Sequence, residues 1–248
     1  MDLAYDDVGT GFPVVLHTGG AGSSSMWRRG GYVDRMPGLR LLLLDHRGRG
    51  ASGRPRDLAA HRASEYVADV TALVDHLGVP GYGFFGYSFG GLVGLLLGAA
   101  DSRLTGLAVL GTVFDPPAPP APTSDYETSL DAGGMAEVVA LVEREEAITL
   151  PDWARAEFME TDPEQFRLTL AANADPDPWD LLPRIRATTI LIAGSEEDPD
   201  DVQGTMAGLM PGARSVHLAG AGHVGAFLRP DEVTEHALPG LRLAAGAD

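Results

Sequence analysis

Short apolar runs alternate along the chain with longer segments whose apolar residues recur at helical spacing. The runs at 12–17 and 39–45 each lead into a glycine-rich turn, which is typical of buried strands in a parallel sheet. Residues 65–77 place apolar side chains at helical spacing, and Gly78 followed by Pro80 predicts the end of that helix. The chain therefore begins with strands and a crossover helix in alternation.

The alternation continues to the end of the chain with one interruption. In order, the further predicted elements are strand 82–85, buried helix 90–100, strand 104–113, strand 189–193, a helix to about 209, strand 215–218 and helix 232–238. Strands that alternate with helices predict a mostly parallel, doubly wound α/β sheet.

The interruption begins with a proline-rich stretch from Asp115 to Pro122, predicted to be a semi-rigid linker. Short helices are predicted at 135–148, 152–159 and 163–172, and no strand is predicted before 188. We therefore expect an α/β core at 1–114 and 181–248. A helical cap at 115–180 is expected to cover the carboxyl edge of the sheet, where open α/β folds bind ligands.

Composition narrows the partners and the chemistry. With 248 residues, 44% of them hydrophobic, the chain is long enough for one large soluble domain. Its net charge of -17 disfavours nucleic acid and anionic membrane surfaces as partners. No cysteine is present, which excludes a thiol nucleophile and a disulfide framework. The first seven residues lack a secretory pattern, so a cytoplasmic location is expected.

A candidate nucleophile follows the predicted strand 82–85. The sequence Gly86-Tyr87-Ser88-Phe89-Gly90 matches G-x-S-x-G between a strand and a helix, which is the context this motif requires. A tight turn there exposes the serine hydroxyl, and the helix N-terminus directs backbone N–H groups toward an anionic intermediate. We therefore predict Ser88 as the nucleophile.

Among seven histidines, His223 is the predicted general base because the motif's chain order of serine, acid and histidine places the base late. It lies in a glycine-rich segment after the last predicted strand, where its ring could reach Ser88. His217 is the competitor, but it lies within that strand and is expected to pack there.

The orienting carboxylate is expected after the strand that ends at Ala193. Asp198 is the first choice, because an Asp before a proline is held in an extended conformation. Glu197 is the runner-up, and Asp115 is a third possibility. For the oxyanion hole, the expected donors are the N–H groups of Phe89 and Gly19, with Gly20 as the alternative to Gly19.

These motifs together resemble those of the α/β-hydrolase superfamily, in particular its small, capped, cofactor-free esterases, lactonases and iminopeptidases. Besides the serine motif, residues 17–20 (His-Thr-Gly-Gly) resemble the family's His-Gly oxyanion loop, and 45–52 resembles its D-x-R-G-x-G-x-S turn. Thr18 departs from the usual glycine. The family's acid position, three residues after a strand-ending glycine, corresponds to Glu197 rather than Asp198.

The resemblance covers essentially the whole chain and implies an α/β-hydrolase fold with a small helical cap inserted after the sixth strand. It implies hydrolysis of a small carboxylic ester or lactone through an acyl-enzyme, without a metal or organic cofactor. Trp153, Phe158 and Met159 are candidate pocket walls, and Phe166 and Trp179 are further ones.

Other activities stay open on the same triad: carbon–carbon bond hydrolysis, aminopeptidase activity and a non-hydrolytic step in specialised metabolism. In a different class, the chain could be a ligand-binding protein with weak turnover. The oligomeric state is not predicted.

Overall fold

One mixed sheet organises the computed structural model, which describes residues 1–114, 125–174, 177–244 and 246. Within these ranges seven strands pair in the order β1-β3-β2-β4-β5-β6-β7. Their bounds are β1 Ala4–Val8, β2 Phe12–His17, β3 Leu39–Asp45, β4 Tyr82–Tyr87, β5 Leu104–Leu110, β6 Thr188–Gly194 and β7 Arg214–Leu218. β1 pairs antiparallel with β3, and the other neighbouring strands run parallel, which confirms the predicted fold class.

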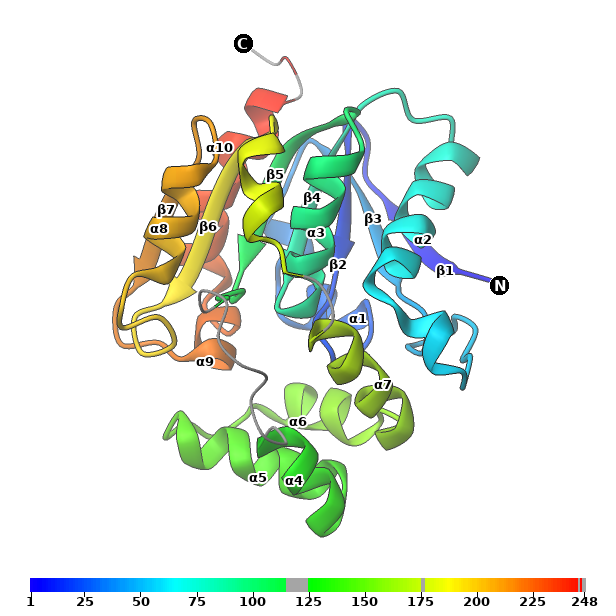
Figure 1. Cartoon of the computed structure of the whole chain (residues 1–248), viewed down its shortest axis with the longest axis vertical. Coiled ribbons are helices and arrows are strands. Elements are labelled where there is room, and N and C mark those ends of the chain that lie inside the picture. Colours follow the sequence, from blue (N-terminus) through cyan, green and yellow to red (C-terminus); the bar gives the residue numbers. More distant parts are fainter. Residues whose placement is uncertain (115–124, 175–176, 245, 247–248) are drawn as a thin grey trace.

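Helices cover both faces of this sheet (Figure 1). One face packs against α2 Ala63–His76, α3 Phe89–Ala100 and α8 Val202–Leu209, and the other against α1 Ser25–Arg29, α9 His223–Phe227 and α10 Pro230–Ala244. Successive side chains of a strand point to opposite faces, so Val15 of β2 joins the first layer while Val14 and Leu16 join the second. Strands buried on both faces explain the continuous apolar runs in the sequence.

Four helices between β5 and β6 lie beyond the carboxyl ends of the strands (Figure 1). They are α4 Asp125–Gly133, α5 Met135–Glu145, α6 Asp152–Met159 and α7 Pro163–Ala174, and residues 125–174 are called the cap below. The cap has its own apolar cluster, which includes Val138, Val142 and Phe158. The cap was expected after the sixth strand, and this prediction was wrong, because the cap follows β5. Within the described residues a single strand, β1, precedes β2.

Three 3-10 helices complete the described elements, at η1 Val33–Arg35, η2 Leu58–His61 and η3 Trp179–Arg184. Leu182 of η3 is fully buried against the layer that contains α3 and α8, so the chain is back in the sheet's core by this point. The predicted linker, residues 115–122, lies outside the described residues. The division of the chain into core and cap stays a prediction.

Two elements near the ends of the sheet had not been predicted. β1 was missed because its central acids, Asp6 and Asp7, are exposed and interrupt the apolar pattern. α9 was missed because five residues preceded by glycine carry too little periodicity to distinguish a helix from a loop. No helix in the described part of the chain combines the length and apolarity needed to cross a membrane.

Candidate active site

Ser88 lies at the sharp turn from β4 into α3. Its backbone has φ 54 and ψ -119, a left-handed conformation that costs energy for a residue with a Cβ. The end of β5 holds this turn, because the Ser88 N–H donates to the Leu110 carbonyl at 2.8 Å and the Thr112 hydroxyl donates to the Ser88 carbonyl at 2.7 Å. The predicted strand-to-helix corner is therefore present, with a strained serine at its apex.

The two motif glycines are required by close backbone approach. A Cβ on Gly86 would collide with the backbone of Gly90, and a Cβ on Gly90 would collide with the His17 carbonyl. This contact brings α3 against the end of β2. The glycines thus place Ser88 beside the loop that follows β2.

His223 approaches Ser88 from the end of β7. Its Nε2 lies 3.0 Å from Ser88 Oγ, within hydrogen-bond distance. The residue opens α9 instead of lying in the expected loop, and the Tyr87 ring stacks on the imidazole with centroids 5.1 Å apart. A Cβ on Gly111 would lie 3.1 Å from His223 Nδ1, so the ring also packs closely on the backbone after β5.

Glu197 is the carboxylate that contacts this histidine. Its Oε1 accepts from His223 Nδ1 at 2.6 Å, which leaves Nε2 of a neutral ring free to accept a proton from Ser88. Burial alone lowers the pKa of His223, but the charge and hydrogen bond of Glu197 and the charge of Glu146 outweigh it, so the net pKa is raised above 6.5.

The preference for Asp198 as the orienting acid was wrong, because its side chain points to α8 and away from His223. Its Oδ1 accepts from the Val202 N–H at 2.8 Å, and its Oδ2 accepts from the Gln203 N–H at 2.9 Å and from His217 Nε2 at 2.8 Å. Burial raises the pKa of Asp198. These hydrogen bonds together lower it by more than burial raises it, so the net pKa lies below its ordinary value. Asp198 therefore stabilises the first turn of α8.

The competitor His217 lies in β7 as expected, and its ring contacts Asp198 instead of Ser88. Together with Asp201 these residues form a group whose potential ligand atoms lie within 4.8 Å of one another, a proximity that the sequence spacing did not predict. Because the Asp198 oxygens already accept hydrogen bonds from α8, the group is accounted for as a helix-capping arrangement. Asp115, the third candidate acid, lies outside the described residues.

The loop after β2 brings Gly19 against Ser88. A Cβ on Gly19 would lie 3.0 Å from Ser88 Cβ, whereas a Cβ on Gly20 would meet the Phe166 ring of the cap. The Thr18 carbonyl accepts from His17 Nδ1 at 2.9 Å. In a trans peptide the N–H points opposite to its carbonyl, so the Gly19 N–H points away from His17. This geometry favours Gly19 over Gly20 as an oxyanion donor, beside Phe89 at the start of α3.

Two buried side chains, His46 and Arg49, contact the backbone carbonyls of this loop. His46 Nε2 lies 3.1 Å from the Gly19 carbonyl, and Arg49 Nε donates to the Gly20 carbonyl at 2.9 Å. Burial lowers the pKa of Arg49 to about 10, so the guanidinium stays charged at neutral pH. Sequence reasoning had matched the turn that contains both residues without assigning them this supporting role.

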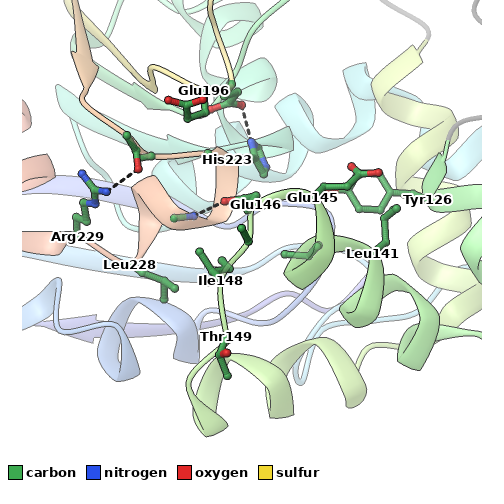
Figure 2. Close-up of a pocket in the computed structure, with 17 residues that line it drawn as sticks. Tyr126, Leu141, Glu145, Glu146, Ile148, Thr149, Glu196, His223, Leu228 and Arg229 are labelled. Atoms are coloured by element: carbon green, nitrogen blue, oxygen red, sulfur yellow. Dashed lines mark hydrogen bonds and ion pairs between the residues drawn. The ribbon is translucent and has the colours of Figure 1, made fainter.

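The cavity beside His223 has a volume of about 980 Å³ and lies between the cap and the loops after β6 and β7 (Figure 2). Its lining residues include Tyr126, Glu145, Glu146, Ile148, Glu196, Glu197, Leu228 and Arg229. Most of the charged side chains in this wall are acidic.

None of the three predicted pocket residues lines this cavity. Phe158 is buried within the cap, Met159 is 50% exposed, and Trp153 packs partly buried against apolar clusters of the cap and the core. Aromatic content in a small helical segment marks its packing as readily as a binding site, so a pocket role for these three residues stays a prediction. The residues that do line the cavity come from the end of α5 and the segment after it, from the turn after β6, and from residues 220–229 around α9.

Comparison with known proteins gives a family match over residues 14–236, to the model described as "Alpha/beta hydrolase family". One relative, "Putative non-heme bromoperoxidase BpoC" of Mycobacterium tuberculosis, is 26% identical, with 94% of this chain and 95% of that protein covered. Another, "Putative carbamate hydrolase RutD" of Azorhizobium caulinodans, is 31% identical over 44% of this chain and 40% of its own length.

Among solved structures, the enol-lactonase from Burkholderia xenovorans LB400 superposes with a TM-score of 0.83 at 25% identity, covering 97% of this chain and 96% of that one. These relatives differ in their named activities while they share one architecture. Assignment of the reaction therefore depends on the residues of the site.

Proposed function

The chain belongs to the α/β-hydrolase family, and from that premise we propose that it is a serine hydrolase that cleaves a small carboxylic ester or lactone. The observation that carries the proposal is the hydrogen-bonded series Ser88–His223–Glu197, with distances of 3.0 and 2.6 Å. This is the geometry of nucleophile, general base and orienting acid. The similarity to an enol-lactonase supports this choice of substrate class.

In the first half of the proposed reaction, Ser88 Oγ attacks the carbonyl carbon while His223 Nε2 takes its proton. Glu197 stabilises the imidazolium that forms. The N–H groups of Gly19 and Phe89 bind the oxyanion of the tetrahedral intermediate. His223 then returns the proton to the leaving alkoxide, which yields an alcohol and an acyl-Ser88.

In the second half, water attacks the acyl carbon and transfers a proton to His223. Collapse of the second tetrahedral intermediate releases the acid and returns the proton to Ser88 Oγ. For a lactone, the alcohol and the acid are two ends of one product. Each proton transfer uses the same 3.0 Å contact between Ser88 and His223.

The test combines covalent labelling with turnover. We expect a fluorophosphonate to add once per chain, at Ser88, and p-nitrophenyl acetate to be hydrolysed. Ser88→Ala should abolish both, and His223→Ala should slow both by several orders of magnitude. His217→Ala is the matched control, because His217 contacts Asp198 and not Ser88, and it should retain labelling and turnover.

Absence of both labelling and ester turnover in the folded wild-type protein would contradict the proposal. If a small ligand then still raised the melting temperature, the chain would be a binding protein of the same fold. Labelling of Ser88 without ester turnover would retain the nucleophile but exclude the simple ester used.

A further inference from the structure

Glu146, a cap residue, contacts the backbone of the helix that carries His223. Its Oε1 accepts from the Val224 N–H and its Oε2 from the Gly225 N–H, both at 2.8 Å. Figure 2 shows this carboxylate directed at α9 beside the histidine. The two N–H groups belong to the first turn of α9, where a helix leaves its donors without partners of its own.

The local backbone is shaped for this contact on both sides. On the α9 side, a Cβ on Gly222 would lie 2.5 Å from Glu146 Oε2, and one on Gly225 would lie 3.2 Å from the same atom. On the cap side, Ala147 has φ 51, a left-handed conformation that is unfavourable for alanine. Ala147 directly follows Glu146, which is the C-cap residue of α5. Strain in a non-glycine residue is retained where the surrounding structure requires it.

From this geometry we propose that Glu146 is a positioning residue for the base: it fixes the first turn of α9, and thereby the imidazole of His223, only while the cap is docked. The inference rests on the proposed serine-hydrolase function. His223 is the first residue of α9, so a rotation of this turn would change the contact of its Nε2 with Ser88. Displacements of about 1 Å at a reacting group can cost roughly a hundredfold in rate.

Several other groups surround His223, and they decide which control is needed. Glu197 and Tyr87 contact the imidazole ring, and Glu146 contacts the helix that carries it. The other ionisable side chains around the cavity are Tyr126, Glu145, Glu196 and Arg229. Glu197 and Glu146 both favour the imidazolium through their charge. Arg229 donates to the carbonyls of Ala219 and Gly220.

Glu145→Gln provides the matched control. Glu145 is the neighbouring carboxylate in the cavity wall, and its side chain accepts no hydrogen bond within the described part of the chain. Glu146→Gln removes the same charge, and it also turns an amide NH₂ toward one of the two N–H donors of α9. Glu146→Asp keeps the charge but shortens the reach, which separates loss of the contact from loss of the charge.

The experiment measures three quantities in the full-length protein: fluorophosphonate labelling rate, the pH profile of kcat/KM, and hydrogen exchange of peptides covering 222–227. For Glu146→Gln we expect labelling about tenfold to a hundredfold slower. The acid limb should move to lower pH, and exchange of the Val224 and Gly225 amides should be faster. Glu146→Asp should also show slower labelling and faster exchange. Because it keeps the charge, the acid limb of its kcat/KM profile should move less. Glu145→Gln should leave exchange at 222–227 unchanged and should slow labelling far less than Glu146→Gln does.

Two results would overturn the inference. One is a lower melting temperature in Glu146→Gln with wild-type labelling, pH profile and exchange at 222–227, which would make Glu146 a simple docking contact. The other is an equal effect of Glu145→Gln and Glu146→Gln on labelling, which would assign the effect to cavity charge alone. Hydrogen exchange needs no turnover, so failure of the serine-hydrolase proposal is read separately, from the absence of wild-type labelling.

Discussion

At the scale of single residues, two adjacent acids serve different partners. The Glu197 and Asp198 backbone N–H groups both donate to the Gly194 carbonyl, within one tight turn after β6. The turn directs the Glu197 carboxylate to His223 and the Asp198 carboxylate into the first turn of α8. The longer side chain reaches the histidine, whereas the shorter one accepts hydrogen bonds from a nearby helix. Side-chain direction, and not the position of Asp198 before a proline, therefore decides which of the two acids contacts His223.

Paired substitutions of these acids test the assignment. Glu197→Gln should lower kcat by about 10³- to 10⁴-fold with little change in melting temperature, because the imidazolium loses its partner. Asp198→Asn should keep kcat within a few-fold but cost about 1–2 kcal/mol of unfolding free energy, because the α8 N–H groups lose a charged acceptor. Steady-state kinetics and urea unfolding measure the two effects. The reverse pattern would restore Asp198 as the acid.

The pKa direction of His223 gives a prediction for the pH profile. Only the neutral ring can accept the Ser88 proton, so kcat/KM should fall as pH drops through the pKa of His223. Since the nearby carboxylates raise that pKa, the midpoint of the acid limb should lie above 6.5. The pH profile of His217→Ala is the control for a contribution from His217, and its acid limb should have the same midpoint as that of the wild type. A midpoint at or below 6.5 in the wild type would contradict the electrostatic argument.

At the scale of elements, α3 has to approach the end of β2 closely. Gly90→Ala would place a methyl group against the His17 carbonyl, so we expect a loss of about 2 kcal/mol or more in unfolding free energy, together with slower labelling of Ser88. Gly208→Ala is the matched control on α8. Nothing lies within 4 Å of a Cβ there, and removing a helical glycine should add about 0.5–1 kcal/mol. Equal effects in urea unfolding would contradict the close-contact explanation.

The elements themselves were predictable where one rule dominated. The bounds of β2 and β3 match the apolar runs to the residue, because parallel strands are buried on both faces. α6 matches its predicted bounds as well. β1 and α9 escaped prediction, since a solvated edge strand and a five-residue helix leave little periodicity.

The candidate site was predictable only in part. Ser88 could be found because the turn motif fits one position. His223 could be found because chain order favours a late histidine and His217 was expected to pack within a strand, and the structure brings Ser88 and His223 together. The choice between Glu197 and Asp198 depends on side-chain direction. The family's spacing after the strand-ending glycine points to Glu197, whereas the preferred argument, an Asp before a proline, concerns backbone conformation and not that direction. Glu146 was not identified at all, because its partners are backbone N–H groups almost eighty positions away in the sequence.

At the scale of the whole molecule, polar contacts join the cap to two segments of the core. Glu146 contacts the start of α9. Glu157 of α6 is buried and accepts from the Ser23 N–H at 3.1 Å, from the Ser25 hydroxyl and from Arg29 at 3.0 Å. These partners lie directly after the loop that contains Gly19 and Gly20. The cap therefore makes polar contacts with the core at two places, the start of α9 and the segment that contains α1.

Removing the charge of Glu157 tests whether this second contact anchors the cap. Glu157→Gln should lower the unfolding free energy by about 2–3 kcal/mol, because hydrogen bonds to a buried charge are stronger than neutral ones and Arg29 loses its partner. It should also speed proteolytic cleavage within the cap at temperatures below the melting transition. Glu160→Gln, at the exposed end of the same helix, should change neither quantity. Equal stability and cleavage in both variants would mean that apolar packing alone holds the cap, and Glu146 would then be the polar contact through which cap position acts on the base.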